Sequence, residues 1–181
     1  MKDYITTYTK RHVTPLDPEP SELSVLDIAH ALSLMVRANG HFPEFYSVGQ
    51  HCIHCAREAQ AEGLANRLVL ACLLHDAGEA YLADITRPVK KHLPKYRETE
   101  QKLLDAVYLR FLGSALTAEE ELEVKRVDDT LLYYEFLHYM GEALQEEPPK
   151  ISSQPVFETR AFAEVEKEYL QLFEELTGKG I

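Results

Sequence analysis

The sequence lacks any long hydrophobic run. In its 181 residues, no stretch approaches the roughly 18 apolar residues that a membrane-spanning helix needs. The first residues, MKDY, do not open a secretory signal peptide. We therefore expect neither a membrane anchor nor a cleaved leader, and we expect a cytoplasmic protein.

Cysteine and positive charge are both scarce. Three cysteines are an odd number without a disulfide framework, which favours a reducing cytoplasm. Asp and Glu outnumber Lys and Arg by 30 to 19, so the formal net charge is -11. A chain this acidic is poorly suited to binding long nucleic acid or an anionic membrane. A small anionic substrate is still compatible with it, because a few local cations or a metal ion can reverse the field in one pocket.

Helical patterns fill most of the chain. No segment alternates with a two-residue period, and there is no internal repeat. Capping residues and terminating glycines predict helices over about 21–37, 47–62, 66–81, 96–112, 117–140 and 158–177. Residues 1–20 should be irregular or extended, and one short turn should follow Pro88. We expect an all-α fold, a bundle of about six or more helices that forms one domain over residues 1–181.

The helix predicted over 66–81 carries ionisable residues where a core helix should avoid them. The apolar run LVLACLL is followed by His75 and Asp76, with Glu79 one turn later and Asp84 just beyond. Helical spacing places His75, Asp76 and Glu79 on one side. Ionised carboxylates are costly to bury unless a partner or a metal ion compensates them. A solvated polar stripe is the plain alternative, but the apolar run before it favours a buried site.

Two other predicted helices offer further metal ligands. His51 lies in the first turn of the helix over 47–62. In the segment VKRVDDTLLYYEF, Asp128 lies beside Val127 and in line with Leu131, which have core spacing. Metal sites draw nitrogen and oxygen ligands from several elements. We therefore expect one divalent metal ion to be held by His51, His75, Asp76 and Asp128.

Cys52 and Cys55 have the spacing of half a zinc site. A second pair is missing from the sequence, Cys72 is distant, and both cysteines fall inside a predicted helix rather than before one. Ala56 follows Cys55, so the haem-attachment pattern also fails. We interpret these cysteines as packing residues.

The two histidines and two aspartates resemble the H…HD…D signature of the HD-domain metal-dependent phosphohydrolases, an all-helical family. FYSVGQH is similar to the segment that introduces the first histidine in the 5'-deoxynucleotidase branch, and LLHDAGEAYLADITRPVK resembles the block that follows. VKRVDD resembles the segment with the last aspartate. DIAHALSLMVRANGHFPEFYSV is similar to the leader of small bacterial and phage members, and it places Arg37 upstream of the first histidine. The resemblance covers about residues 5–140, and the metal-binding core about 21–140.

The resemblance implies an enzyme that uses one divalent metal ion (Mn, Co, Fe, Zn, Ni or Mg) to hydrolyse a nucleotide-sized phosphate, foremost a nucleoside 5'-monophosphate. Arg37 has the planar fork suited to a phosphate edge, and Lys90 could reach a phosphate. Glu79 could act as general acid or base, and Asp84 could orient water or bond a sugar hydroxyl. That branch usually has a tryptophan directly after the arginine, and this chain has none. The resemblance therefore supports the metal chemistry of this chain more strongly than the identity of its substrate.

Three alternatives stay open at this point. A deoxynucleoside triphosphate triphosphohydrolase would need extra cations near the site, which the stretch TRPVKKH offers as Arg87, Lys90 and Lys91. A cyclic-nucleotide phosphodiesterase is a weaker option. A non-catalytic nucleotide- and metal-binding module would be favoured by loss of Glu79 or of a ligand, and all are present. The expected partner is a small nucleotide, and a homodimer is compatible with the sequence.

Overall fold

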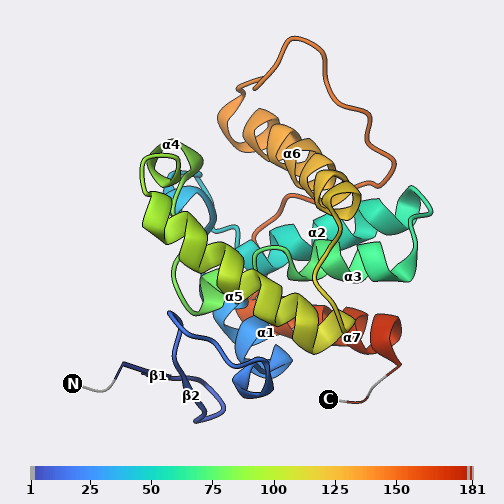
Figure 1. The fold of residues 1–181 in the computed structure, drawn as a ribbon. Helices are drawn as coiled ribbons and strands as arrows, with labels where there is room; N and C mark the ends of the chain where they lie inside the picture. Colours follow the sequence, from blue (N-terminus) through green and yellow to red (C-terminus); the bar gives the residue numbers. More distant parts are fainter. Residues whose placement is uncertain (1–2, 179, 181) are drawn as a thin grey trace.

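The computed structural model describes residues 3–178 and 180 and is mostly helical (Figure 1). This part of the chain forms seven α-helices, which confirms the predicted all-α fold: α1 (Val25–Leu34), α2 (Val48–Ala61), α3 (Asn66–Leu74), α4 (Arg87–Lys90), α5 (Pro94–Leu112), α6 (Ala118–Met140) and α7 (Phe162–Thr177). Before α1, β1 (Ile5–Thr6) pairs with β2 (His12–Val13) in a small antiparallel hairpin. This hairpin falls in the segment that was predicted to be irregular or extended.

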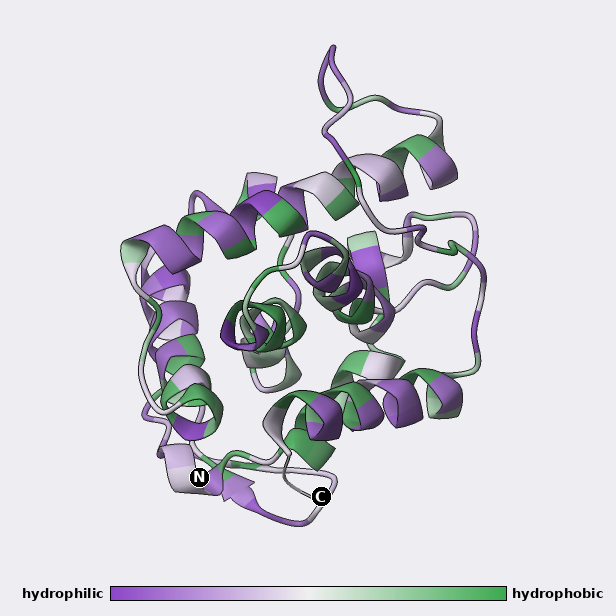
Figure 2. Cartoon of the chain, turned by 90° about the vertical axis from the view of Figure 1, so that its right-hand side faces the viewer, coloured by the Kyte–Doolittle hydropathy of each residue, from purple (hydrophilic) through white to green (hydrophobic). Residues whose placement is uncertain are grey.

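The helices pack around α2 and α3, which lie side by side in the middle of the molecule (Figure 1). Helices α1 and α7 come from opposite ends of the chain and contact each other, while α5 and α6 pack against α3. Figure 2 shows hydrophobic residues on the helix sides that face the interior. None of the helices in the described residues has the length and apolarity needed to cross a membrane.

Side-chain caps determine where the helices beside the candidate site begin. The Ser47 side chain accepts the Gln50 backbone N–H at 3.1 Å and starts α2 one turn before His51. Thr117 and Glu120 form a reciprocal capping box that starts α6. Both starts agree with the sequence prediction, because the caps are local features of the chain.

The predicted helix over 66–81 ends early, and the structure corrects it. Helix α3 stops at Leu74, and a tighter 3-10 turn follows over Ala77–Ala80. His75 Nδ1 lies 2.8 Å from the Cys72 carbonyl oxygen, which in a continuing helix would accept the Asp76 backbone N–H. The side chain thus takes over a backbone acceptor and ends the helix at the point where the site begins.

The first predicted helix also ends early, at Leu34 rather than Arg37. Val36 forms a bridge with Ser47, and the Arg37 N–H donates to the Tyr46 carbonyl at 2.8 Å. Arg37 is therefore not a cation at the end of α1. The next residue, Ala38, has φ 51°, a left-handed conformation that is costly for a residue with a Cβ and is typical of functional loops.

A long irregular strap, residues 141–161, joins α6 to α7. It arches away from the end of α6 and returns past α2 (Figure 1). The Ser152 and Ser153 backbone N–H groups donate to the two carboxylate oxygens of Glu58, each at 2.7 Å. Residues 158–161 belong to this strap, so α7 begins at Phe162 and not at the predicted residue 158.

Candidate metal centre

The four ligands predicted from the sequence converge on one point. His51 Nε2 from α2 lies 3.2 Å from His75 Nε2 and 3.1 Å from Asp128 Oδ1. Asp76 Oδ2 lies 3.4 Å from His75 Nε2 and 3.9 Å from His51 Nε2. Two ligands held about 2.1 Å from one ion are separated by about 3.0 Å at a right angle and about 3.4 Å at the tetrahedral angle. The observed spacing therefore suits ligands that share an ion.

The hydrogen bonds behind the two histidines direct their Nε2 atoms into this cluster. His75 Nδ1 faces a carbonyl oxygen, and His51 Nδ1 lies 2.5 Å from the Glu135 carboxylate. Both partners are acceptors, so each Nδ1 carries a proton. In the neutral ring, each Nε2 then carries a lone pair that faces the cluster and can bind a metal ion; in the protonated ring, Nε2 donates to Asp128 instead. This pattern of carboxylate, histidine and open lone pair is typical of metal-binding histidines.

The electrostatics of the cluster favour a positive charge at its centre. Burial alone would lower the pKa of His75, but the Asp76 carboxylate, Cys52 and hydrogen bonding to Asp128 raise it well above its usual value. Burial alone would raise the pKa of Asp128, yet hydrogen bonds and charge from His51 and His75 hold it well below its usual range. A divalent ion can supply this charge in place of a proton.

A buried thiol adjoins the same point, so His51, Cys55 and His75 form a group that can hold a metal ion. Cys55 Sγ lies 3.4 Å from His51 Nε2. Burial raises the pKa of the Cys55 thiol well above its usual value. The thiol is therefore protonated unless a metal displaces its proton, whereas Asp128 is already ionised. Asp128 is therefore a better prepared ligand than Cys55, and the sequence interpretation of Cys55 gave it no part in the site.

Arg37 lies at the edge of the cluster, directly after the bridge between Val36 and Ser47 that precedes α2. Its Nη1 donates to Asp76 Oδ2 at 3.2 Å, and its Nη2 lies 3.9 Å from Asp128 Oδ1. Nε and Nη2 both donate to Glu135 Oε2 at 3.4 Å. The guanidinium thus faces the same carboxylates that surround the candidate metal position, where an anion bound to the ion would lie.

Glu79 and Asp84 line the space in front of the ligands. Glu79 is 5% exposed, and its Oε2 is buried without a hydrogen-bond partner among the described residues. Burial, with the nearby charges of Asp76 and Asp84, raises the pKa of Glu79 well above its usual value. Burial also raises the pKa of Asp84. Lys90 Nζ lies 3.8 Å from Glu79 and 2.6 Å from Glu100, so its charge is already paired.

A cavity of about 580 Å³ brings these groups together. This volume is within the range of roughly 300–1,000 Å³ that is typical of small-molecule sites. Its charged lining residues are Arg37, Asp76, Glu79, Asp84, Arg87, Lys90 and Asp128. Its apolar lining residues include Phe42, Ile85, Pro88, Leu132, Phe136, Met140 and Leu144.

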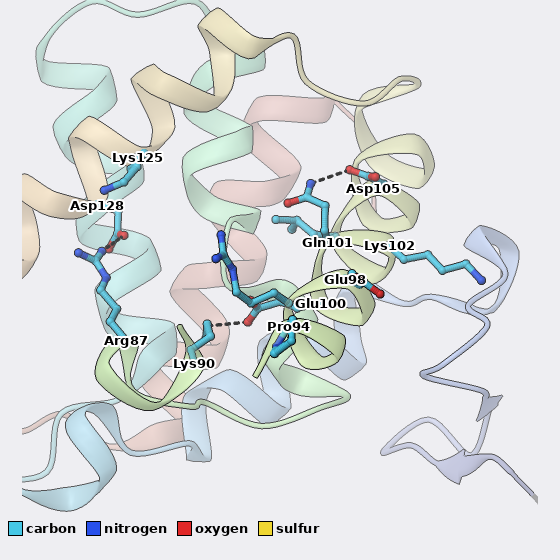
Figure 3. A pocket seen from close by; sticks show the side chains of 12 residues that line it. Arg87, Lys90, Pro94, Glu98, Glu100, Gln101, Lys102, Asp105, Lys125 and Asp128 are labelled. Atoms are coloured by element: carbon cyan, nitrogen blue, oxygen red, sulfur yellow. Dashed lines mark hydrogen bonds and ion pairs between the residues drawn. The ribbon is translucent and has the colours of Figure 1, made fainter. Parts of the chain in front are cut away.

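A wider depression of about 1030 Å³ is lined by residues of α4, α5 and α6 and shares Arg87, Lys90 and Asp128 with this cavity (Figure 3). Figure 3 shows Arg87 reaching toward Asp128, and Arg87 donates to Asp128 Oδ2 at 2.5 Å and to Asp129 at 2.6 Å. Lys90 pairs with Glu100, and the Gln101 amide donates to Asp105 at 2.9 Å. Polar groups of this depression are largely paired with one another, which makes it a weaker candidate than the cavity with the ligands.

The sequence interpretation missed Glu135. Its side chain is fully buried on α6, and it contacts His51, Arg37 and Tyr46. Burial alone would raise the pKa of Glu135, but the charges and hydrogen bonds of these neighbours lower it to about 2. A signal was present: Glu135 follows Asp128 by seven residues, so both lie on one face of a helix.

Comparison with known proteins finds similar sequences, but their names state no activity. The chain is 36% identical over 104 residues to uncharacterized protein YfdR of Escherichia coli, an alignment that covers 58% of this chain and 55% of the relative. It is 38% identical over 125 residues to uncharacterized protein RCAP_rcc00048 of Rhodobacter capsulatus, covering 65% of this chain and 63% of the relative. The chain thus spans less than two thirds of the length of either protein. No protein-family model matches it.

Proposed function

We propose that this protein is a metal-dependent phosphohydrolase of the HD type that hydrolyses a nucleoside 5'-monophosphate. The observation that carries the proposal is the clustering of His51, His75, Asp76 and Asp128 beside the guanidinium of Arg37, with 3.1–3.9 Å between the two histidines and between each histidine and each aspartate. Two neutral imidazoles and two carboxylates would leave a bound divalent ion with little net charge, so an anion can approach it. The resemblance of the sequence to HD phosphohydrolases supports the same reading.

Phosphate hydrolysis needs an activated water, neutralised phosphoryl oxygens and a proton for the leaving oxygen. His51, His75, Asp76 and Asp128 would hold a divalent ion, which would supply Lewis acidity toward the phosphate and the attacking water. Arg37 contributes two N–H donors in one plane, which match a pair of phosphoryl oxygens. The Glu135 carboxylate holds Nε and Nη2 of Arg37, and Nη1 lies toward the ligands.

Glu79 is suited to act as the general acid. Its raised pKa favours the protonated side chain, and its Oε2 has no hydrogen-bond partner among the described residues, so a proton can be held there for the leaving oxygen. As the bond between phosphorus and the sugar oxygen breaks, a proton passes from Glu79 to that oxygen. Asp84, also on the cavity wall with a raised pKa, can accept the proton of the attacking water or bond a sugar hydroxyl.

The composition of the cavity supports a nucleotide-sized substrate. Its charged lining residues can accept a phosphate, and its apolar lining residues, which include Phe42, Phe136 and Met140, can accept the organic part. Ala38 also lines the cavity. It takes the place directly after Arg37 where the deoxynucleotidase branch usually has tryptophan, so the organic part meets a different wall here.

Triphosphate hydrolysis is the second candidate, and it rests on Arg87 and Lys90, which line the cavity beyond the ligands. Both cations are paired: Arg87 with Asp128 and Asp129, and Lys90 with Glu100. A longer polyphosphate chain would have to break these pairs, which favours the monophosphate. A non-catalytic binding module would not need a buried Glu79 with a raised pKa and an Oε2 that lacks a partner among the described residues.

A screen of nucleoside mono-, di- and triphosphates with added Mn²⁺ or Co²⁺ tests the proposal. We expect release of inorganic phosphate from monophosphates and its loss on chelation. Release of intact triphosphate would replace the proposal with the second candidate. Metal and nucleotide binding without any turnover would point to a binding module.

A further inference from the structure

We infer that Glu135 is a positioning residue that couples the metal ligand His51 to the phosphate-binding residue Arg37. The inference rests on the proposed function, because it assigns one carboxylate to two parts of the same site. Glu135 lies on α6, the helix that also carries Asp128, and its side chain is fully buried.

The two oxygens of Glu135 have separate partners. Oε1 lies 2.5 Å from His51 Nδ1 and accepts the Tyr46 hydroxyl at 3.0 Å. Oε2 accepts Nε and Nη2 of Arg37, each at 3.4 Å. The carboxylate plane therefore bridges the histidine and the arginine, and Tyr46 helps to fix its orientation.

Each contact has a specific consequence for the site. A carboxylate behind Nδ1 fixes the tautomer of His51 and makes its Nε2 a stronger ligand. The same carboxylate accepts hydrogen bonds from Nε and Nη2 on one edge of the Arg37 guanidinium, so that Nη1 is directed toward Asp76. Neither role follows from filling space in a core, because an apolar side chain of similar size would satisfy packing but would leave His51 Nδ1, and Nε and Nη2 of Arg37, without this acceptor.

The coupling between His51 and Arg37 can be measured through metal binding and anion binding. If Glu135 holds His51 and Arg37 together, its loss should weaken metal binding and anion binding at once. Partners outside the ligand shell typically contribute about 10- to 100-fold to metal affinity. Residues that act through one another also show non-additive effects, so changing Arg37 should matter less once Glu135 is gone.

Glu135→Gln is the decisive variant, because it keeps the size and one acceptor while it places an amide against Arg37. Mn²⁺ affinity is measured by calorimetry, and inorganic phosphate affinity is then measured at saturating Mn²⁺. We expect Mn²⁺ binding to weaken about 10- to 100-fold and phosphate binding to weaken about tenfold. Arg37→Lys should weaken phosphate binding less in the Glu135→Gln background than alone.

Glu58→Gln is the matched control, since Glu58 is also fully buried and hydrogen-bonded but lies on the strap side of α2. It should leave Mn²⁺ affinity unchanged. Tyr46→Phe, which removes one bond to Glu135, should weaken Mn²⁺ binding a few-fold and serves as the test if Glu135→Gln does not fold.

Unchanged Mn²⁺ affinity in Glu135→Gln, or in Tyr46→Phe if that is the folded variant, would overturn the inference. Weaker Mn²⁺ binding with normal phosphate binding, or additive effects with Arg37→Lys, would overturn the coupling. A wild-type protein that binds no Mn²⁺ would overturn the proposed function and the inference together, a result distinct from a defect confined to the variants.

Discussion

Glu58 and Glu135 are both fully buried glutamates in helices, yet their surroundings differ in kind. Glu58 on α2 accepts backbone N–H groups of Ser152 and Ser153 at 2.7 Å, and thereby anchors the strap. Glu135 on α6 contacts a histidine, an arginine and a tyrosine, two of which extend into the site. Burial alone therefore does not distinguish a structural carboxylate from a functional one; the partners do.

The difference has an energetic basis. A carboxylate bound by main-chain N–H groups is compensated completely by the fold, so its effect ends with stability. A carboxylate bound by side chains changes the orientation and basicity of groups that can themselves bind a metal ion or an anion. In this protein those groups point to the ligands at the cavity. Substitutions in the two regions should therefore affect different measurable properties.

The largest effect should come from the ligands themselves. Asp76→Ala removes a carboxylate from the cluster, and we expect loss of Mn²⁺ binding. Phosphate release should fall by more than roughly 100-fold, the largest loss typical of changing a residue that only hydrogen-bonds to a ligand. Metal analysis of the purified variant and a phosphate assay measure the two effects. Retained metal with normal turnover would remove Asp76 from the site.

Next comes Glu79→Gln, which separates proton transfer from metal binding. Mn²⁺ affinity should stay near the wild-type value, while turnover should fall about 100- to 10,000-fold, the usual contribution of a general acid or base. Because Glu79 must be protonated to donate, wild-type activity should decline as pH rises through its raised pKa. That decline should be absent from the residual activity of the variant. Loss of metal binding as well would make Glu79 a structural residue.

Arg37→Lys tests the arginine side of the Glu135 contact. Lysine keeps the charge but loses the planar fork, so catalytic efficiency should fall about ten- to two-hundred-fold, the equivalent of roughly 1.5–3 kcal/mol. Steady-state kinetics on a monophosphate measure the change. Wild-type kinetics in this variant would show that a positive charge is all that the position requires.

The smallest catalytic effect should come from the strap. Glu58→Gln leaves one of the two N–H groups facing an amide nitrogen at the buried end of the side chain, so we expect a loss of about 1–3 kcal/mol in the free energy of unfolding. Urea denaturation measures this loss. Turnover at a temperature where the variant is folded should equal that of the wild type. A large catalytic defect in Glu58→Gln would show that Glu58 also affects the site, which would contradict the difference proposed between the two glutamates.

Local signals in the sequence predicted most of the helices. Ser47 and Thr117 cap α2 and α6 as expected, because a cap needs only neighbouring residues. The ends of α1 and α3 were predicted wrongly, because non-local or side-chain contacts decide them. Val36 pairs with Ser47, and the His75 ring takes the Cys72 carbonyl.

Helical spacing and motif together indicated Asp128, which lies near His51 in the fold, whereas His75 lies just after α3 and was indicated by the motif. The contribution of Glu135 depends on how α2 and α6 pack, and nothing in the sequence near it indicates that Arg37 and His51 would meet there. Lys90 shows the converse. Its place in the chain suggested a phosphate contact, but folding brings Glu100 within 2.6 Å of it.

Anomalous diffraction from a crystal soaked in Mn²⁺ tests the central claim most directly. The account predicts one strong peak per chain, about 2.0–2.6 Å from His51 Nε2, His75 Nε2 and the carboxylates of Asp76 and Asp128. A peak bound by His51, Cys55 and His75 without the aspartates would contradict it, as would a protein that orders no ion in this cluster.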